Sequence, residues 1–275
     1  MRGKLRKITV AMDASNYSLT AAKWGAFIAS HVGAELELLH VVDIRVMNSP
    51  FLADISGALG AAPYEEFVPK MKVLMQERGE DILKGGVSAC KEFNITPSTK
   101  VESGILNEVI ENTSQNTDLI VLGRRGEHFN IGLHLFGSDG EKLARHAGCS
   151  CLIVPDFFSL PKRILIGVHN SGPSRSAGHW GEFLSEIFPD NEVFPIFVRE
   201  DENEVSEFKK IAGKDVIVRE GNAEDELISF CSENPEFTIL VVGATGHTRT
   251  LKEFIIGTVS SHLLHKTESA VLLAR

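Results

Sequence analysis

Two glycine-spaced segments contain the residue types best suited to chemistry in this sequence. "VLGRRGEHFNIGLHLFGSDG" begins at Val121, and "VVGATGHTRTLKEFIIGTVS" begins at Val241. Each reads as an apolar strand, then Gly-x-x-Gly, a spacer of ten residues, and a glycine next to a hydroxyl residue. Glycines let a ligand approach the backbone closely, and we expect them to allow a turn with positive φ. Successive N–H groups and the N-terminus of a following helix favour an anion, so both segments predict phosphate binding.

The two segments offer equivalent sets of candidate phosphate ligands. Neither has a lysine before its hydroxyl residue, which excludes the Walker loop. The glycines follow the fourth predicted strand of each repeat, which excludes the dinucleotide fingerprint of a first strand. The candidates are Gly123, Arg124, Gly126, Gly137 and Ser138 in the first segment, and Gly243, Gly246, Gly257 and Thr258 in the second.

A repeated pattern surrounds these segments, so the elements that position them are duplicated too. "ITVAMDASNYS" begins at Ile8 and "ILIGVHNSGPS" at Ile164, and "KWGAFIAS" and "HWGEFLSE" follow them at equal distance. This alignment pairs the two tryptophans of the chain, Trp24 and Trp180. We therefore predict two domains, residues 1–156 and 163–275, with a short link between them and a shortened second copy.

Each copy alternates apolar strands with helices, which predicts an α/β fold of two repeated, doubly wound, open parallel five-stranded sheets. Gly, Pro and Ala fill the segment 47–63, which predicts a mobile loop inside a lid-like insertion at about 44–70. The expected strands lie near 6–13, 35–42, 96–102, 118–123 and 150–155, and then near 163–168, 192–198, 214–219, 237–243 and 270–274. In the first copy the expected helices lie near 18–32, 66–93, 105–115 and 138–147.

Composition excludes several classes of function. The net charge of −9 argues against non-specific binding to nucleic acid or to an anionic membrane, because both need a positive field. No run approaches 18 uninterrupted apolar residues, so no membrane span is expected. The four cysteines form no Cys-x-x-Cys pair, and no secretory signal is visible at the N-terminus. We expect a protein of the reducing cytoplasm.

The sequence resembles the universal stress protein family in its tandem form. The resemblance rests on "VAMDASNYS" at the first strand, "LLHVVD" at the second and the glycine-spaced segment at the fourth, and it covers almost the whole chain. It implies the adenine nucleotide alpha hydrolase-like fold. It also implies that the last strands, "CLIVP" and "AVLLA", lie against each other as an intramolecular pseudo-dimer. Association of whole chains into a homodimer stays open.

The resemblance also implies a binding site for ATP, with Mg²⁺ as a further candidate. In the ATP-binding branch of the family the first-strand aspartate holds the nucleoside, which implies Asp13 here. Backbone groups at the end of the second strand meet the adenine, which implies Val41, with Val198 at the matching place in the second copy. The glycine-spaced segment would hold the phosphates.

Three departures from the family pattern bear on this site. The spacer is one residue longer than the family's usual one. Asp139 follows Ser138, and a carboxylate there would repel phosphates unless a divalent metal lies between them. His169 stands where Asp13 stands in the first copy, and neutral imidazole lacks the two acceptor oxygens of a carboxylate. We expect ATP or another adenine nucleotide in the first copy and a degenerate or altered second site.

Other readings stay open at this point. Asp13 could cap the helix that follows it. The chain could be an enzyme that hydrolyses ATP slowly or transfers an adenylyl group, although no nucleophile elbow or His-Glu-x-x-His motif is present. It could also be a scaffold that binds no nucleotide. The leading hypothesis is a nucleotide-dependent stress or signalling protein whose protein partners the sequence does not name.

Overall fold

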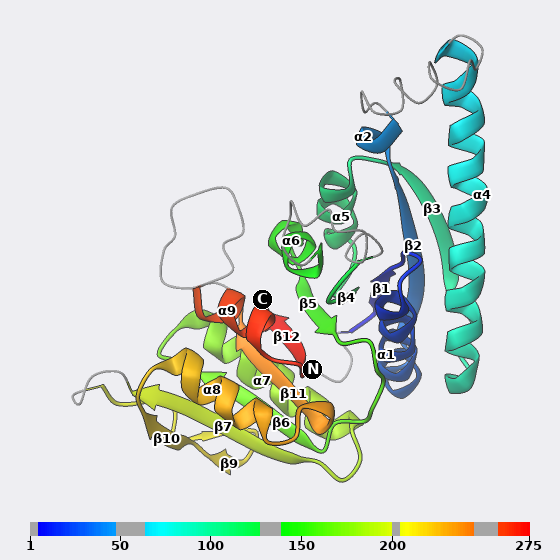
Figure 1. Ribbon diagram of the computed structural model, residues 1–275. Helices are drawn as coiled ribbons and strands as arrows, with labels where there is room; N and C mark the ends of the chain where they lie inside the picture. Colours follow the sequence, from blue (N-terminus) through cyan, green and yellow to red (C-terminus); the bar gives the residue numbers. More distant parts are fainter. Residues whose placement is uncertain (1–4, 48–63, 127–138, 200–203, 245–257) are drawn as a thin grey trace.

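One twisted sheet runs through the whole molecule (Figure 1). The computed structural model describes residues 5–47, 64–126, 139–199, 204–244 and 258–275. Within these ranges ten strands form a single sheet in the order β10-β7-β6-β11-β12-β5-β4-β1-β2-β3. Neighbouring strands are parallel except at the centre, where β5 and β12 run antiparallel. No described helix is both long and apolar enough to cross a membrane.

The first half of the sheet has the predicted parallel strands in the order β3-β2-β1-β4-β5. "LIVLG" and "SCLIV" are buried almost throughout, as expected for strands covered on both faces. The strands are β1 Lys7–Ala11, β2 Glu35–Asp43, β3 Ser98–Gly104, β4 Leu119–Gly123 and β5 Ser150–Val154. The helices are α1 Asn16–Val32, α2 Ile44–Met47, α4 Tyr64–Cys90, the 3₁₀ turn η1 Lys91–Phe93, α5 Leu106–Ser114 and α6 Asp139–His146.

The second half repeats this order as β10-β7-β6-β11-β12. Its strands are β6 Arg163–Val168, β7 Glu192–Arg199, β10 Ile217–Glu220, β11 Thr238–Gly243 and β12 Ala270–Ala274. Its helices are α7 Gly172–Ile187, α8 Ala223–Ser232, the 3₁₀ turn η3 Pro235–Phe237 and α9 Thr258–Lys266.

A small hairpin in the second half replaces the long helix α4. Its strands are β8 Lys210–Ile211 and β9 Lys214–Asp215, which pair antiparallel. Ala212 and Gly213 have φ of 51° and 75°, so the chain turns back tightly there. The single strand expected at 214–219 is therefore divided between β9 and β10. The loop and lid expected at 47–63 overlap α2 only at Met47, and residues 48–63 lie outside the described ranges.

The two halves join through the strands that the sequence indicated. In the antiparallel pair, Leu272 lies opposite Leu152 and Leu273 opposite Cys151. This arrangement confirms that "CLIVP" and "AVLLA" lie side by side, so the two copies of one chain form their own pseudo-dimer. The sheet continues across the junction.

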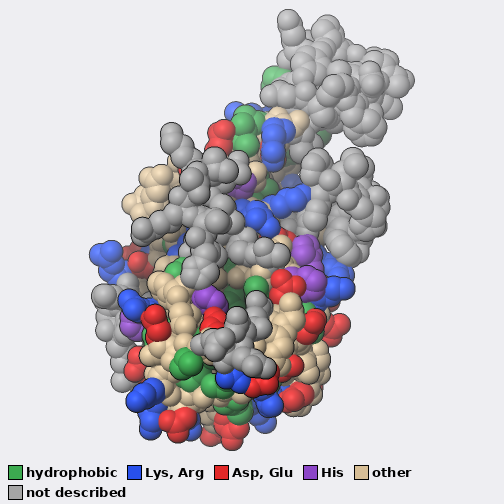
Figure 2. All heavy atoms as spheres, turned by 90° about the vertical axis from the view of Figure 1, so that its left-hand side faces the viewer, with side chains coloured by type: hydrophobic (Ala, Val, Ile, Leu, Met, Phe, Trp, Pro, Cys, Tyr) green, Lys and Arg blue, Asp and Glu red, His purple; other side chains and the backbone are tan. Residues whose placement is uncertain are grey.

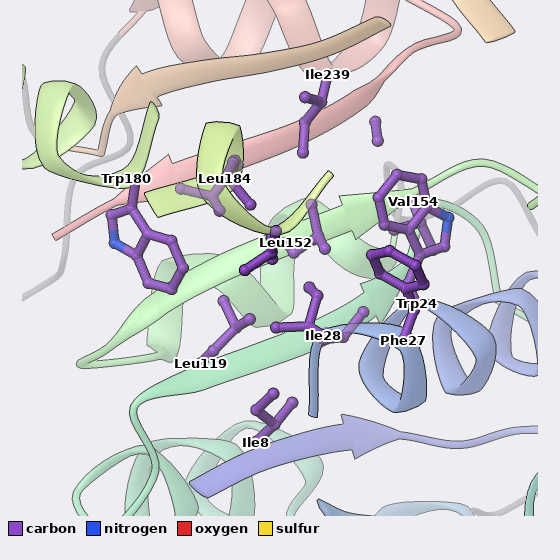
Figure 3. Packing of buried hydrophobic residues seen from close by; sticks show 14 of the residues in the cluster. Ile8, Trp24, Phe27, Ile28, Leu119, Leu152, Val154, Trp180, Leu184 and Ile239 are labelled. Carbon is purple, nitrogen blue, oxygen red and sulfur yellow. The ribbon is translucent and has the colours of Figure 1, made fainter. Parts of the chain in front are cut away.

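The paired tryptophans pack at this junction (Figure 3). Trp24 of α1 makes edge contacts with Phe158 in the link and Phe188 after α7, with ring centroids 5.5 and 5.8 Å apart. Trp180 of α7 donates from Nε1 to the Ser150 hydroxyl of β5, at 2.9 Å. Each tryptophan helix therefore packs against the other half of the chain, which accounts for the repeated Trp in packing terms.

Candidate functional site

Asp13 forms a tight turn directly after the end of β1. Its Oδ1 accepts hydrogen bonds from the Ser15 backbone N–H at 2.9 Å and from the Ser15 hydroxyl at 2.5 Å. Ser15 is the N-cap of α1, because its Oγ accepts from the Ser18 N–H at 3.2 Å. The Ser18 hydroxyl in turn donates to the Asp13 carbonyl at 2.6 Å. The reading in which Asp13 itself caps the helix is therefore wrong: Ser15 caps it, and Asp13 orients Ser15.

Gly123, at the end of β4, lies against this turn. A Cβ on Gly123 would stand 2.7 Å from the Tyr17 Cβ, so the first turn of α1 packs directly on the strand end. A Cβ on Gly140, in α6, would stand 2.5 Å from the Gly123 carbonyl. The Ser15 hydroxyl also reaches the Arg125 carbonyl at 3.5 Å. The Asp13 turn and the start of the glycine-spaced segment are thus adjacent.

Gly243 is confined in the same way in the second half. A Cβ there would stand 2.5 Å from the Pro173 Cβ in the first turn of α7. The Ser260 hydroxyl of α9 donates to the Gly243 carbonyl at 3.1 Å. Positive φ among the described glycines occurs at Gly33, Gly213 and Gly221. The expectation of positive φ is therefore wrong for Gly123 and Gly243, where the close approach of a helix excludes a side chain.

Arg124 does not face the proposed ligand. Its backbone N–H donates to the Val154 carbonyl at 2.9 Å, and its buried guanidinium donates from Nη2 to the Ser269 carbonyl, in the second half of the chain. Burial lowers the pKa of Arg124 to about 10, which still leaves it charged at neutral pH. The structure thus directs the Arg124 side chain to the junction of the two halves.

His40 is a polar neighbour of Asp13 that the sequence reasoning missed. It lies on β2, next to the half-buried Val41, and its Nδ1 bonds to the Met12 carbonyl at 2.8 Å. Burial lowers the pKa of His40, although the bond to Met12 and the nearby Asp13 oppose this effect. A neutral imidazole therefore fixes the strand end that carries Asp13. The signal in the sequence was the histidine between the apolar residues of "LLHVV".

The matching turn of the second half has a different partner. His169 Nε2 lies 3.7 Å from the Glu204 carboxylate, and the Asn170 side chain bonds to the backbone at Val205 and at Glu207. Val198, the counterpart of Val41, is buried. The second copy thus lacks the carboxylate turn and places its own chain beside the end of β6.

Several candidates lie outside the described residues. Gly137, Ser138, Gly246 and Gly257 are in this group, so the structure does not test them. Thr258 begins α9 and Asp139 begins α6, which agrees with a helix opening after the last glycine of each segment. Among the described residues, no group of three or more His, Cys, Asp and Glu side chains could hold a metal ion.

Known proteins of one family match this chain. A model of the universal stress protein family matches residues 4–155 and 183–275. Universal stress protein Slr1230 of Synechocystis sp. is 23% identical over 289 residues, which cover 98% of this chain and 100% of the relative. Universal stress protein MJ0531 of Methanocaldococcus jannaschii is 31% identical over 153 residues, which cover 54% of this chain and 81% of the relative.

Solved structures agree in fold. The crystal structure of a universal stress protein from Archaeoglobus fulgidus superposes with a TM-score of 0.70 at 17% identity, covering 98% of this chain and 96% of that one. This likeness shows the fold over both halves. Because the family model matches most of the chain in two separate segments, the chain belongs to the universal stress protein family, in the tandem form with two such regions.

Proposed function

We propose that the first half of the chain binds ATP or another adenine nucleotide, and that the protein acts in the cytoplasm as a nucleotide-dependent stress or signalling protein. The observation that carries this proposal is the contact between the Asp13 turn and the glycine-spaced segment through Ser15 and the Arg125 carbonyl. A carboxylate suited to ribose hydroxyls and a backbone suited to phosphates therefore lie side by side at the carboxyl ends of β1 and β4.

Each described residue has a distinct part in this proposal. Asp13 would accept hydrogen bonds from the nucleoside, while Ser15 holds the carboxylate in place. The backbone at Val41, on the neighbouring strand, would meet the base. Gly123 and Gly126 would present backbone groups to the phosphates, and Gly137 and Ser138 complete the candidate set beyond the described ranges. Arg124 is excluded because its guanidinium reaches Ser269.

The distribution of charge supports a small anionic ligand. The chain carries a net charge of −9, and acidic and basic side chains are interspersed over the described lower part of the face in Figure 2. Non-specific nucleic-acid binders instead present a field of one positive sign. A nucleotide held by aligned backbone amides requires only local donors, so it suits an acidic protein.

Titration with ATP, with and without MgCl₂, tests the proposal on Asp13→Asn. Loss of a charged hydrogen-bond acceptor costs about 1.5–3 kcal/mol, so the dissociation constant should rise about tenfold to a hundredfold. Asp156→Asn is the matched control, because Asp156 is exposed in the link, and its affinity should be unchanged. Equal affinities for wild type and Asp13→Asn would remove the site from the first half. Recovery of ADP or adenylylated product in place of ATP would favour the enzyme alternative.

A further inference from the structure

A segment without regular secondary structure lies beside the end of β6 in the second half of the chain. It comprises Glu204–Phe208, between β7 and β8. The Asn170 side chain holds it from both amide atoms: Nδ2 donates to the Val205 carbonyl at 2.9 Å, and Oδ1 accepts from the Glu207 N–H at 2.8 Å. One side chain therefore satisfies a backbone acceptor and a backbone donor two residues apart, as a neighbouring strand would.

The segment turns alternate side chains toward the protein. Glu204, Ser206 and Phe208 are partly buried, whereas Val205 and Glu207 are exposed. The Glu204 side chain is only 27% exposed, and its carboxylate faces His169 Nε2 at 3.7 Å. Phe208 packs against the apolar core. This period of two indicates that one face of the segment rests on the end of β6.

In the first half, the residue at the matching position cannot fasten a segment in this way. Ala14 takes the place of Asn170 and is exposed, and its methyl group makes no hydrogen bond. The long helix α4 packs on β2 and α1 in the first half, where the second half has the hairpin β8–β9. The residues matched by the family model also exclude 156–182, the range that contains His169 and Asn170. The second half therefore differs from the first half at the residue that fastens the segment.

We propose that Glu204–Phe208, fastened by Asn170, occupies the position beside β6 that the nucleoside takes beside β1, so that the chain binds one nucleotide and not two. This inference rests on the proposed function of the first half. His169 and Asn170 are then specificity-determining residues of the second half, because they hold a segment of the same chain where a nucleoside would otherwise bind.

Hydrogen exchange of the full-length chain tests the fastening without any ligand. Asn170→Ala removes both bonds to the segment and should speed amide exchange across 204–208 by about tenfold or more, the factor that about 1.4 kcal/mol represents. Asn191→Ala is the matched control, because the Asn191 side chain also bonds to two backbone carbonyls of the second half, those of Ser185 and Phe188. It should leave 204–208 unchanged. Equal exchange in Asn170→Ala and wild type would overturn the proposal.

Counting ATP bound at saturation tests the closure itself. Wild type should bind one ATP per chain, and two would overturn the proposal. The double variant H169D/N170A installs the first-half pair Asp-Ala, and it should bind a second ATP. The triple variant D13N/H169D/N170A should return to about one ATP per chain at the lowest ATP concentration that saturates H169D/N170A. If H169D/N170A opens the segment by hydrogen exchange but still binds one ATP, the segment is not what excludes the nucleoside. Wild type binding no ATP at all would instead remove the proposed function.

Discussion

Gly123 and Gly243, at the ends of β4 and β11, each have a packing role that the sequence did not reveal. The sequence singled out Gly123 and Gly243 as backbone exposed to a ligand. In the structure, each is also the point where the first turn of a helix meets the sheet, with 2.7 Å from a Cβ on Gly123 to the Tyr17 Cβ and 2.5 Å from one on Gly243 to the Pro173 Cβ. The repeat therefore preserves a packing requirement as well as a candidate ligand.

Gly123→Ala should destabilise the protein by about 1–3 kcal/mol, because its methyl group would overlap Tyr17 and the backbone of α1. Denaturant unfolding measures this loss. Gly172→Ala is the matched control: nothing lies within 4 Å of a Cβ there, and its φ is not in the left-handed region. The control should stay within about 0.5 kcal/mol of wild type. Equal stability of the two variants would show that the strand end has room for a side chain.

Arg124→Met should leave ATP affinity within about twofold of wild type. The Arg124 guanidinium bonds to the Ser269 carbonyl, on the other half of the chain, and only its backbone adjoins the glycine-spaced segment. Arg125, one residue later, is exposed and serves as the comparison. Titration with ATP decides the matter. A tenfold loss of affinity in Arg124→Met would return this residue to the phosphate site.

At residue scale, the sequence predicted identities better than environments. The glycines and the paired tryptophans were visible as repeated residues, and Asp13 was visible as part of the family pattern "VAMDASNYS". Three features were not visible in the sequence: the direction of the Arg124 side chain, the neutral His40 bonded to Met12, and the bonds from Asn170 to a distant segment. Each of them depends on which part of the chain lies opposite. A single sequence carries no record of such long-range neighbours.

At the scale of elements, the strands were predictable because each buried parallel strand is a short apolar run. The helix cap of α1 and the hairpin were harder to predict from the sequence. Ser15, not Asp13, caps α1, and the hairpin β8–β9 replaces a helix because Ala212 and Gly213 adopt positive φ. The sequence "ENEVSEFKKIA" has no strong hydrophobic periodicity, so the sequence alone does not predict its structure. Its position beside β6 follows from tertiary contacts with Asn170.

Ser15→Ala should weaken both the fold and the site, because one hydroxyl caps α1 and also donates to Asp13. Loss of an N-cap costs about 1 kcal/mol of stability. Asn222 caps α8 by accepting from the Glu224 and Asp225 N–H groups, far from the Asp13 turn, so Asn222→Ala is the matched control. Both variants should lose similar stability in denaturant, but only Ser15→Ala should lose ATP affinity. Equal ATP affinity of Ser15→Ala and Asn222→Ala would show that Ser15 caps α1 without supporting the nucleotide site.

At the scale of the whole molecule, equivalent positions of the two copies meet at the junction. Glu141 and Arg145 of α6 correspond in the repeat to Ser261 and His265 of α9. Glu141 accepts from the Ser261 hydroxyl at 2.6 Å and from Arg145, and its other oxygen lies 2.7 Å from His265 Nε2. Arg145 also reaches the Ser261 hydroxyl at 3.3 Å. This pattern is that of a two-fold interface, here built within one chain.

This network makes the stability of the junction depend on pH. Burial alone would raise the pKa of Glu141, but the hydrogen bonds from Ser261 and Arg145 and the nearby positive charges outweigh it, so the pKa lies below the ordinary value of 4.5. A carboxyl whose folded pKa is depressed contributes stability above its unfolded pKa and loses it as pH falls through the folded pKa. The contribution should therefore be complete at neutral pH, decrease as pH falls below about 4.5, and be lost as pH falls through the lower folded pKa.

Glu141→Gln should lose about 1–3 kcal/mol of unfolding free energy at pH 7, because a buried charged acceptor is removed from Arg145 and His265. The difference from wild type should shrink as pH falls below 4.5, since protonation removes the same charge from wild type. Denaturant unfolding at a series of pH values measures both effects. Glu92→Gln, which breaks an exposed pair with Lys23, should keep the wild-type profile. Parallel profiles for Glu141→Gln and wild type would mean that the two helices meet without this carboxylate, and that the antiparallel strands and the tryptophans hold the halves together alone.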